Sequence, residues 1–160
     1  MALRNIITKE NDILGKRAKE VTEVNDRILM ILDDMLETMR EFNGLGIAAP
    51  QVGVLRRMFI VEVEDQLVEL INPEILKIDG CQKSEEGCLS VPGIIGAVER
   101  PAYVKMKGLN RHGDQVVVEG TELMAVALCH EYDHLEGILF VEKATDLYEV
   151  GDEQPEEEQD

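Results

Sequence analysis

Apolar residues recur at helical spacing between residues 25 and 42, with charged residues between them. This pattern is typical of an amphipathic helix that packs one face on a core, and Asn25 precedes it as a helix cap. The apolar positions are Ile28, Leu32, Met35, Leu36 and Met39. Residues 43–53 are glycine-rich and uncharged and include Pro50. We therefore expect a helix over 25–42, followed by a loop.

The middle of the chain is rich in β-forming residues, in short segments bounded by polar turns. Asn72-Pro73 is expected to end one of these segments, and residues 110–114 form a polar loop typical of a hairpin. The predicted strands are 57–63, 67–71, 103–107 and 115–119. A second apolar helix is predicted over 122–136. This order of elements predicts an α+β fold with mostly antiparallel sheets.

Composition bounds the class of protein. The chain has 160 residues, of which 44% are hydrophobic, and we expect a single domain over 1–148. We find no membrane span and no export signal, and three cysteines suit reduced thiols in the cytoplasm. The net charge is -17, and residues 149–160 form an acidic tail that we expect to be disordered. Such a charge argues against direct nucleic-acid binding.

Candidate chemistry lies in the second predicted helix, at His130-Glu131-Tyr132-Asp133-His134. Four residues are slightly more than one helical turn, so both imidazoles emerge on one face and can bind a divalent metal. Glu131 beside them suits a base for metal-bound water. Thr121 is expected to cap this helix and Gly137 to follow its end. The apolar stripe that continues from the two histidines predicts a floor for a hydrophobic substrate side chain: Leu123, Val126 and Ala127.

A third metal ligand is needed, and no histidine follows His134. Cys88, in the segment Glu86-Gly87-Cys88-Leu89-Ser90, is the better candidate, because a thiolate with two imidazoles leaves a fourth position open for water. Taken alone, Cys88 also suits a small core residue. The other cysteines, Cys81 and Cys129, are expected in the core, and His112 in a solvated turn.

Three segments together resemble the motifs of the peptide deformylases, in the same order and with similar separations. They are Gly44-Leu45-Gly46-Ile47-Ala48-Ala49-Pro50-Gln51, the Glu86–Ser90 segment, and His130-Glu131-Tyr132-Asp133-His134-Leu135-Glu136-Gly137. The resemblance covers about residues 1–145. It implies a hydrolase that removes the formyl group from the initiator formylmethionine of nascent proteins. A central metal-binding helix, with the antiparallel sheets around it, would carry the H-E-x-x-H sequence.

The resemblance also implies a role for each matching residue. Cys88, His130 and His134 would bind one divalent metal, Fe(II) in the native enzyme, with Zn(II), Ni(II) or Co(II) as replacements. Metal-bound hydroxide would attack the formyl carbon, with Glu131 as general base and acid. Gln51 and the Leu89 N–H would stabilise the oxyanion. The residues that would bind the substrate are Gly44, Leu45, Gly46, Leu123, Val126 and Ala127.

The chain departs from its relatives in places. Cys129 replaces a common Gln, and Ile94 and Ile95 replace an aromatic residue and an Arg, which implies a different preference for the later substrate residues. An acidic tail replaces the longer C-terminal helix that can contact the ribosome. We also expect an ion pair between Glu86 and Arg100, such that reversing both charges restores what either single change loses.

Two other functions are compatible with the residues. A zinc peptidase would use H-E-x-x-H but gives Cys88, Gln51 and the glycine loop no task. An inactive metal-binding module would not need Glu131. The expected partners are N-formylmethionyl peptides of nascent chains and the ribosome, with no membrane partner, and the protein is expected to be a monomer.

Overall fold

The computed structural model describes residues 2–150, which form two α-helices, eight strands and three short 3-10 turns. The helices are α1 (Asp26–Glu41) and α2 (Glu122–Leu135). The strands are β1 (Gly46–Ala48), β2 (Met58–Val63), β3 (Gln66–Asp79), β4 (Gln82–Cys88), β5 (Val91–Arg100), β6 (Tyr103–Leu109), β7 (Gln115–Thr121) and β8 (Thr145–Glu149). The 3-10 turns are η1 (Asp12–Gly15), η2 (Ala49–Val52) and η3 (Phe140–Glu142).

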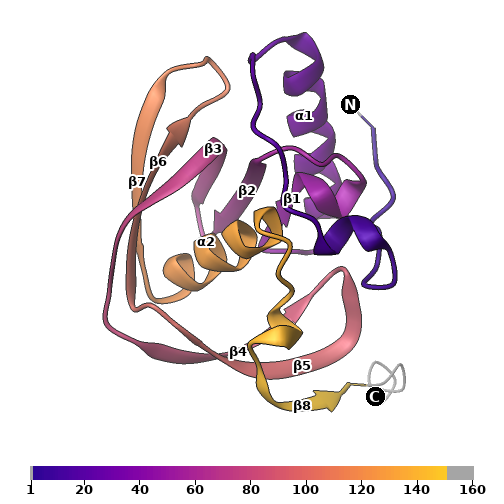
Figure 1. Cartoon of the computed structure of the whole chain (residues 1–160), viewed down its shortest axis with the longest axis vertical. Coiled ribbons are helices and arrows are strands. Elements are labelled where there is room, and N and C mark those ends of the chain that lie inside the picture. The colour runs from indigo at the N-terminus through magenta and orange to yellow at the C-terminus, as the bar shows by residue number, and fades with distance from the viewer. Residues whose placement is uncertain (1, 151–160) are drawn as a thin grey trace.

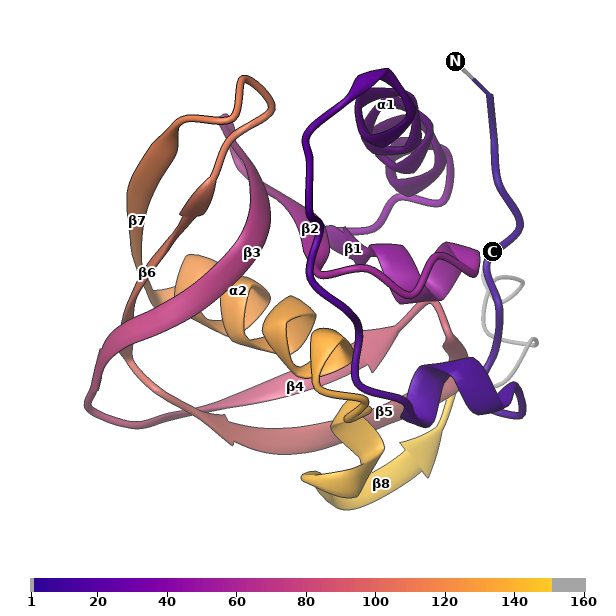
Figure 2. The same cartoon turned by 45° about the horizontal axis from the view of Figure 1, so that its top comes forward.

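The strands form two antiparallel sheets with α2 between them. One sheet has the order β1-β2-β3-β6-β7 and the other has the order β4-β5-β8. Figure 1 shows α2 in the middle of the molecule, with the three-stranded sheet beneath it. Figure 2 shows α1 apart from α2, on the far side of β1 and β2. The predicted α+β class, with antiparallel sheets around a central helix, is confirmed.

Both predicted helices are present within a residue of their expected ends. The Asn25 side chain accepts a hydrogen bond from the N–H of Ile28, as a helix cap does. Thr121 stands at the cap position of α2, but its side chain makes no capping hydrogen bond there, so that part of the prediction is wrong. Gly137 follows α2 with a φ of 78°, a left-handed conformation that glycine adopts without strain.

The sequence predicted that Asn72 and Pro73 end a strand, and this is wrong, because β3 continues through them. They form an irregularity within β3, where the pairing with β6 shifts register and Asn72 has a φ of 53°. The Asn72 amide bonds both backbone groups of Val21, at 2.8 Å each, which ties the N-terminal segment to the sheet. The predicted loop 43–53 likewise contains ordered elements, namely β1 and η2.

The three-stranded sheet was not predicted. In β4, polar and charged residues occupy most positions, so the strand lacks the alternation by which strands are recognised. Cys81, expected in the core, is exposed in the turn before β4, whereas Cys129 is buried as expected. Glu149, the first residue of the expected acidic tail, belongs to β8 and pairs with Ile94 of β5. Residues 151–160 of that tail lie outside the described residues.

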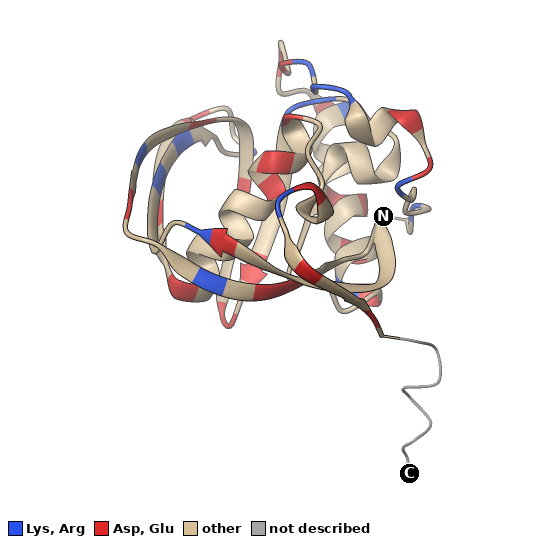
Figure 3. Cartoon of the chain, turned by 60° about the horizontal axis from the view of Figure 1, so that its bottom comes forward, with Lys and Arg blue, Asp and Glu red and all other residues tan. Residues whose placement is uncertain are grey.

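The core has three parts. The largest lies between α2 and the five-stranded sheet, the second beneath α1, and the third between the three-stranded sheet, η1 and η3. Acidic residues are spread over helices and strands of the surface (Figure 3). Within residues 2–150, no helix is both long and apolar enough to cross a lipid bilayer.

Candidate metal centre and its cleft

The three predicted metal ligands meet where α2 passes the end of β4. His130 and His134 lie one turn apart on α2, and Cys88 is the last residue of β4. One ligand atom from each of the three lies within 4.8 Å of the others. The Cys88 Sγ is 3.4 Å from the His134 Nε2, and the two imidazole rings are 5.1 Å apart at 69°. A thiolate and two imidazoles in this arrangement suit a tetrahedral metal with one position open.

A carboxylate from β4 orients one of the imidazoles. The Nδ1 of His130 is 2.8 Å from the Glu86 Oε1, which leaves the Nε2 available for a metal. Burial by itself raises the pKa of Glu86, but hydrogen bonds from Arg100 and His130 lower it to about 2. Glu86 is therefore ionised at neutral pH, and it accepts the proton of the Nδ1. Burial lowers the pKa of His134, so this second imidazole is neutral.

Arg100 connects this carboxylate to α2. Its guanidinium donates to both oxygens of Glu86, at 2.8 Å each, and to the Oδ2 of Asp133 at 2.7 Å. Arg100 is only 3% exposed, and Lys143 also contacts Asp133, at 3.0 Å. The predicted ion pair between Glu86 and Arg100 is therefore present. The roles of Asp133 and of the contact between Glu86 and His130 were not predicted.

The predicted base, Glu131, is buried on the cleft side of α2. Its side chain is 4% exposed, and its Oε1 has no hydrogen-bond partner among residues 2–150. Buried polar atoms rarely stay unpaired, so such an oxygen is suited to a ligand or a water molecule. Burial raises the pKa of Glu131 to about 7. Gly46 passes so close that a Cβ there would lie 2.6 Å from the Glu131 Oε2.

The predicted oxyanion donors stand opposite α2. Gln51, in η2, is 1% exposed, and its Nε2 lies 3.6 Å from the Cys88 Sγ and 3.1 Å from the Ser90 Oγ. Leu89 follows Cys88 directly in the turn between β4 and β5. The sequence did not identify Ser90 as a partner of Gln51, and the spacing between them, 39 residues, gave no signal.

These residues line a cleft of about 1160 Å³. All predicted site residues line it except His134, which lies behind Cys88 and is 1% exposed. Leu45 and Leu123 stand at the rim and are 48% and 46% exposed, while Val126 and Ala127 are buried in the floor. The residues from both ends of the chain that complete the wall were not predicted: Asn5, Ile6 and Val150.

The positions predicted to depart from relatives fall in two places. Ile94 and Ile95 line the cleft on β5, so their predicted location beside the substrate is compatible with the structure. Cys129 is buried in the core between α2 and the five-stranded sheet. Burial raises the pKa of its thiol to about 11, which makes it unreactive at neutral pH. His112 is exposed in the turn between β6 and β7, as predicted.

Comparison with known proteins identifies the family. The family model described as polypeptide deformylase matches residues 3–149. The chain belongs to the polypeptide deformylase family. It is 54% identical over 143 residues to a peptide deformylase of Alkaliphilus metalliredigens, a match that covers 89% of this chain and 97% of that protein. A peptide deformylase of Acetivibrio thermocellus is 55% identical over 143 residues, covering 89% of this chain and 84% of that one.

Solved structures of deformylases have the same fold. The crystal structure of peptide deformylase from Thermotoga maritima superposes with a TM-score of 0.87 at 39% identity, over 89% of this chain and 98% of that one. The peptide deformylase of Ehrlichia chaffeensis, solved in complex with actinonin, gives a TM-score of 0.89 at 33% identity, over 91% of each chain.

Proposed function

We propose that the protein is a metal-dependent hydrolase that removes the formyl group from N-formylmethionyl peptides of nascent proteins. The observation that carries this proposal is the buried, unpaired carboxylate of Glu131 beside the three assembled ligands, in the wall of a peptide-sized cleft. Membership of the deformylase family supports the same reaction.

The donor set fits a divalent metal. We propose that Cys88, His130 and His134 hold Fe(II) in the cell and accept Zn(II), Ni(II) or Co(II) as replacements, because thiolate and imidazole ligands suit all four. The metal would supply Lewis acidity and lower the pKa of a bound water toward neutrality. The Glu86 carboxylate keeps the Nε2 of His130 directed at this position.

Glu131 would move the proton. Its pKa of about 7 lets the carboxylate accept a proton from the attacking water and deliver it afterwards to the leaving amine. Its free Oε1 is the atom available for that transfer. The absence of a Cβ at Gly46 leaves room for this carboxylate, since a Cβ there would lie 2.6 Å from the Glu131 Oε2. General acid–base catalysis of this kind contributes about 10²- to 10⁴-fold to a rate.

Gln51 and Leu89 would stabilise the negative charge that forms on the formyl oxygen. The donors proposed are the Gln51 Nε2 and the backbone N–H of Leu89, which approach the cleft from two different segments. Donors fixed in place before reaction are effective because they need no reorganisation, and losing one costs about 10²- to 10³-fold in turnover.

The peptide would bind as an additional strand. β1 is the edge strand of its sheet, because β2 pairs with only one of its sides. Gly44, Leu45 and Gly46 line the cleft there, so an extended peptide can add to this edge. The methionine side chain would then lie on the apolar floor formed by Leu123, Val126 and Ala127.

We further propose that the protein acts as a monomer in the cytoplasm, on chains that emerge from the ribosome. A thiolate ligand needs a reducing compartment, because oxidation of Cys88 would remove it from the metal. Given the net charge of -17, the proposed contact with the ribosome would not involve its RNA.

The test is release of formate from N-formylmethionyl-alanyl-serine by protein purified without oxygen. We expect turnover by the wild type, and a loss of at least about 100-fold in Glu131→Gln with the metal content unchanged. The N-acetylmethionyl peptide serves as the control substrate. Formate release that is unchanged in Glu131→Gln would refute the role of Glu131. Cleavage of unformylated peptides without formate release would instead favour a peptidase.

A further inference from the structure

We propose that Ser90 is a positioning residue, which holds the Gln51 carboxamide so that one N–H faces the reacting centre. This inference rests on the proposed function, since it concerns a donor to the formyl oxygen. Ser90 is fully buried, and its Oγ accepts a hydrogen bond of 3.1 Å from the Gln51 Nε2. It lies two residues after Cys88 and directly after Leu89, in the turn between β4 and β5.

The orientation of the carboxamide is fixed at both of its ends. The Gln51 Oε1 accepts the backbone N–H of Ala48 at 2.9 Å, which places the Nε2 on the other side. A flipped amide would put its donor against another donor, which removes a hydrogen bond in a buried position. Ser90 takes one of the two Nε2 hydrogens. The second is then directed toward Cys88, whose Sγ is 3.6 Å from the Nε2.

The N-terminal segment holds the two partners together. The backbone N–H of Ile7 donates to the Gln51 carbonyl at 2.8 Å, and that of Lys9 donates to the Ser90 carbonyl at 3.0 Å. Gln51 belongs to η2 and Ser90 to the turn after β4, which no continuous strand connects. Residues 7–9 therefore bridge the two segments next to the side-chain hydrogen bond between them.

The expected effect follows from what Ser90→Ala removes. The variant keeps the Gln51 Nε2 and the hydrogen bond from the Ala48 N–H to the Gln51 Oε1. The Gln51 amide loses its other anchor, the Ser90 hydroxyl. The net value of one hydrogen bond corresponds to about a 2- to 12-fold change, and we expect kcat to fall by this factor with little change in KM. Complete loss of the donor, about 10²- to 10³-fold, sets the upper limit.

A double-mutant cycle separates positioning from a structural role. Ser90→Ala is measured alone and in a Gln51→Leu background, which has no amide to orient. If Ser90 acts through Gln51, its loss reduces kcat in the wild type and changes it less than about twofold in Gln51→Leu. An equal loss in both backgrounds would overturn the proposal.

A second measurement does not depend on turnover. In zinc-loaded protein, the two side-chain amide protons of Gln51 should have NMR shifts displaced from those of free glutamine, and these shifts should move toward the free values in Ser90→Ala. If wild-type protein releases no formate, the proposed function fails, while this spectrum still decides whether Ser90 anchors the amide. Unchanged amide shifts in Ser90→Ala would overturn the anchoring.

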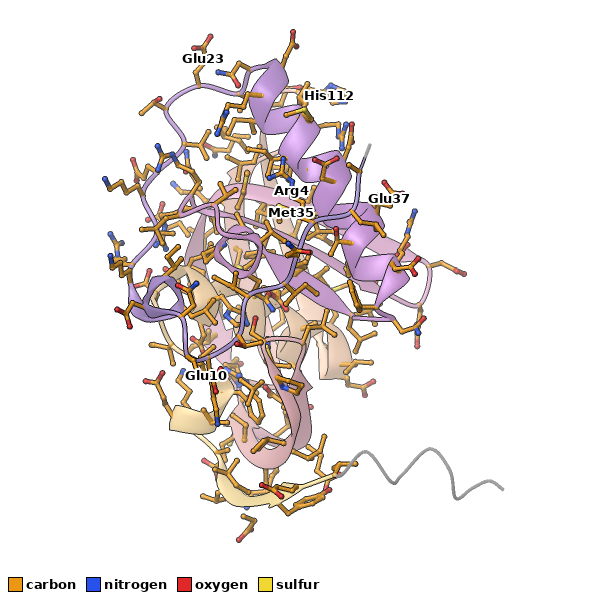
Figure 4. The ribbon with its side chains drawn as sticks, turned by 90° about the vertical axis from the view of Figure 1, so that its right-hand side faces the viewer. Arg4, Glu10, Glu23, Met35, Glu37 and His112 are labelled. Atoms are coloured by element: carbon orange, nitrogen blue, oxygen red, sulfur yellow. The ribbon has the colours of Figure 1, made fainter. Side chains whose placement is uncertain are left out.

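Thr38→Val is the matched control for loss of a buried hydroxyl. Thr38 is fully buried in α1, and its Oγ1 accepts the N–H of Arg4 at 2.9 Å. Figure 4 shows Arg4 beside α1, and neither Arg4 nor Thr38 is among the residues that line the cleft. We expect Thr38→Val to lower the unfolding midpoint, as Ser90→Ala does, but to leave kcat and the Gln51 amide shifts unchanged. A loss of kcat in Thr38→Val equal to that in Ser90→Ala would show that lost stability is the cause.

Discussion

Exchanging the charges of Glu86 and Arg100 should fail to restore the protein, contrary to what a simple ion pair predicts. Arg100 donates to Glu86 and also to Asp133, while Glu86 accepts from His130. Glu86→Arg would place a cation against the Nδ1 proton of His130. Arg100→Glu would place a carboxylate against Asp133. The exchange therefore repairs one contact and reverses two others, so we now expect no rescue where the sequence alone predicted one.

The magnitude follows from burial. Arg100→Leu removes the buried cation that Glu86 and Asp133 share and leaves Asp133 only its contact with Lys143. Loss of one partner from a buried pair costs about 3–5 kcal/mol of unfolding free energy. In the double variant, attraction between positions 86 and 100 returns. Repulsion at Asp133 remains, moderated by Lys143, whose side chain is 44% exposed. We expect the double variant to stay at least about 2 kcal/mol less stable than wild type.

The metal site should report the same defect. Without an acceptor for its Nδ1 proton, His130 loses its fixed orientation, and loss of such a partner costs about 10- to 100-fold in metal affinity. The assay is urea unfolding of metal-stripped protein, together with zinc affinity by competition with a chelator. Both are measured on the two single variants and the double variant.

Arg40 and Glu62 provide the matched control. They form a two-bond ion pair at 2.9 and 2.7 Å on the surface, and neither side chain has a third hydrogen-bond partner in the described part of the chain. Exchanging these charges should restore the small effect of each single change and leave zinc affinity unaffected. Recovery of the Glu86 and Arg100 double variant to within about 1 kcal/mol of wild type, with wild-type zinc affinity, would refute the four-group network.

Three further predictions follow from the cleft. Gly46→Ala should lower kcat by about tenfold or more with metal retained, because the new Cβ displaces Glu131, whereas Gly15→Ala meets no atom within 4 Å and should have no effect. The described residues that line the cleft include Glu85 but no Lys or Arg. A lysine at the third peptide position should therefore give about a two- to fivefold higher kcat/KM than a glutamate at low salt. Glu85→Gln should reduce this preference and Asp65→Asn should not, which peptide pairs at two salt concentrations will check. Removal of metal with a chelator should lower the melting temperature, and added zinc should restore it in wild type but not in Cys88→Ala.

The elements that sequence could predict are those whose buried positions are apolar. In α1, the apolar stripe and the Asn25 cap define the helix, and both are present. β4 was missed because its fully buried residue is Glu86, which a hydropathy pattern reads as exposed. Its burial is possible only because Arg100 of β5, 14 residues away, donates to both of its carboxylate oxygens. β3 was cut short because Pro73 lies at an irregularity in the pairing, where a proline is tolerated.

The candidate site was predictable where chemistry alone restricts the residue type. Thiolate and imidazole are ligands that suit Fe(II) and Zn(II), so Cys88, His130 and His134 could be selected by type and order. Ser90 and Asp133 could not be selected, because each acts by contacting a residue far away in sequence. A serine and an aspartate are common at any surface, and their partners become evident only when η2, β5 and α2 come together.

The geometry of the metal site depends on the β4–β5 hairpin as much as on the helix that carries two of its ligands. β4 supplies both Cys88 and Glu86, and Glu86 in turn orients His130 on α2. β5 supplies Arg100, which bonds Glu86 on one side and Asp133 of α2 on the other. Two polar contacts therefore join the hairpin to the helix: Glu86 contacts His130, and Arg100 contacts Asp133. A substitution in β5 at a residue that does not contact the metal should for this reason lower metal affinity before it disturbs α2. Measuring both the amide exchange of α2 and the zinc affinity of Arg100→Leu would separate the two effects.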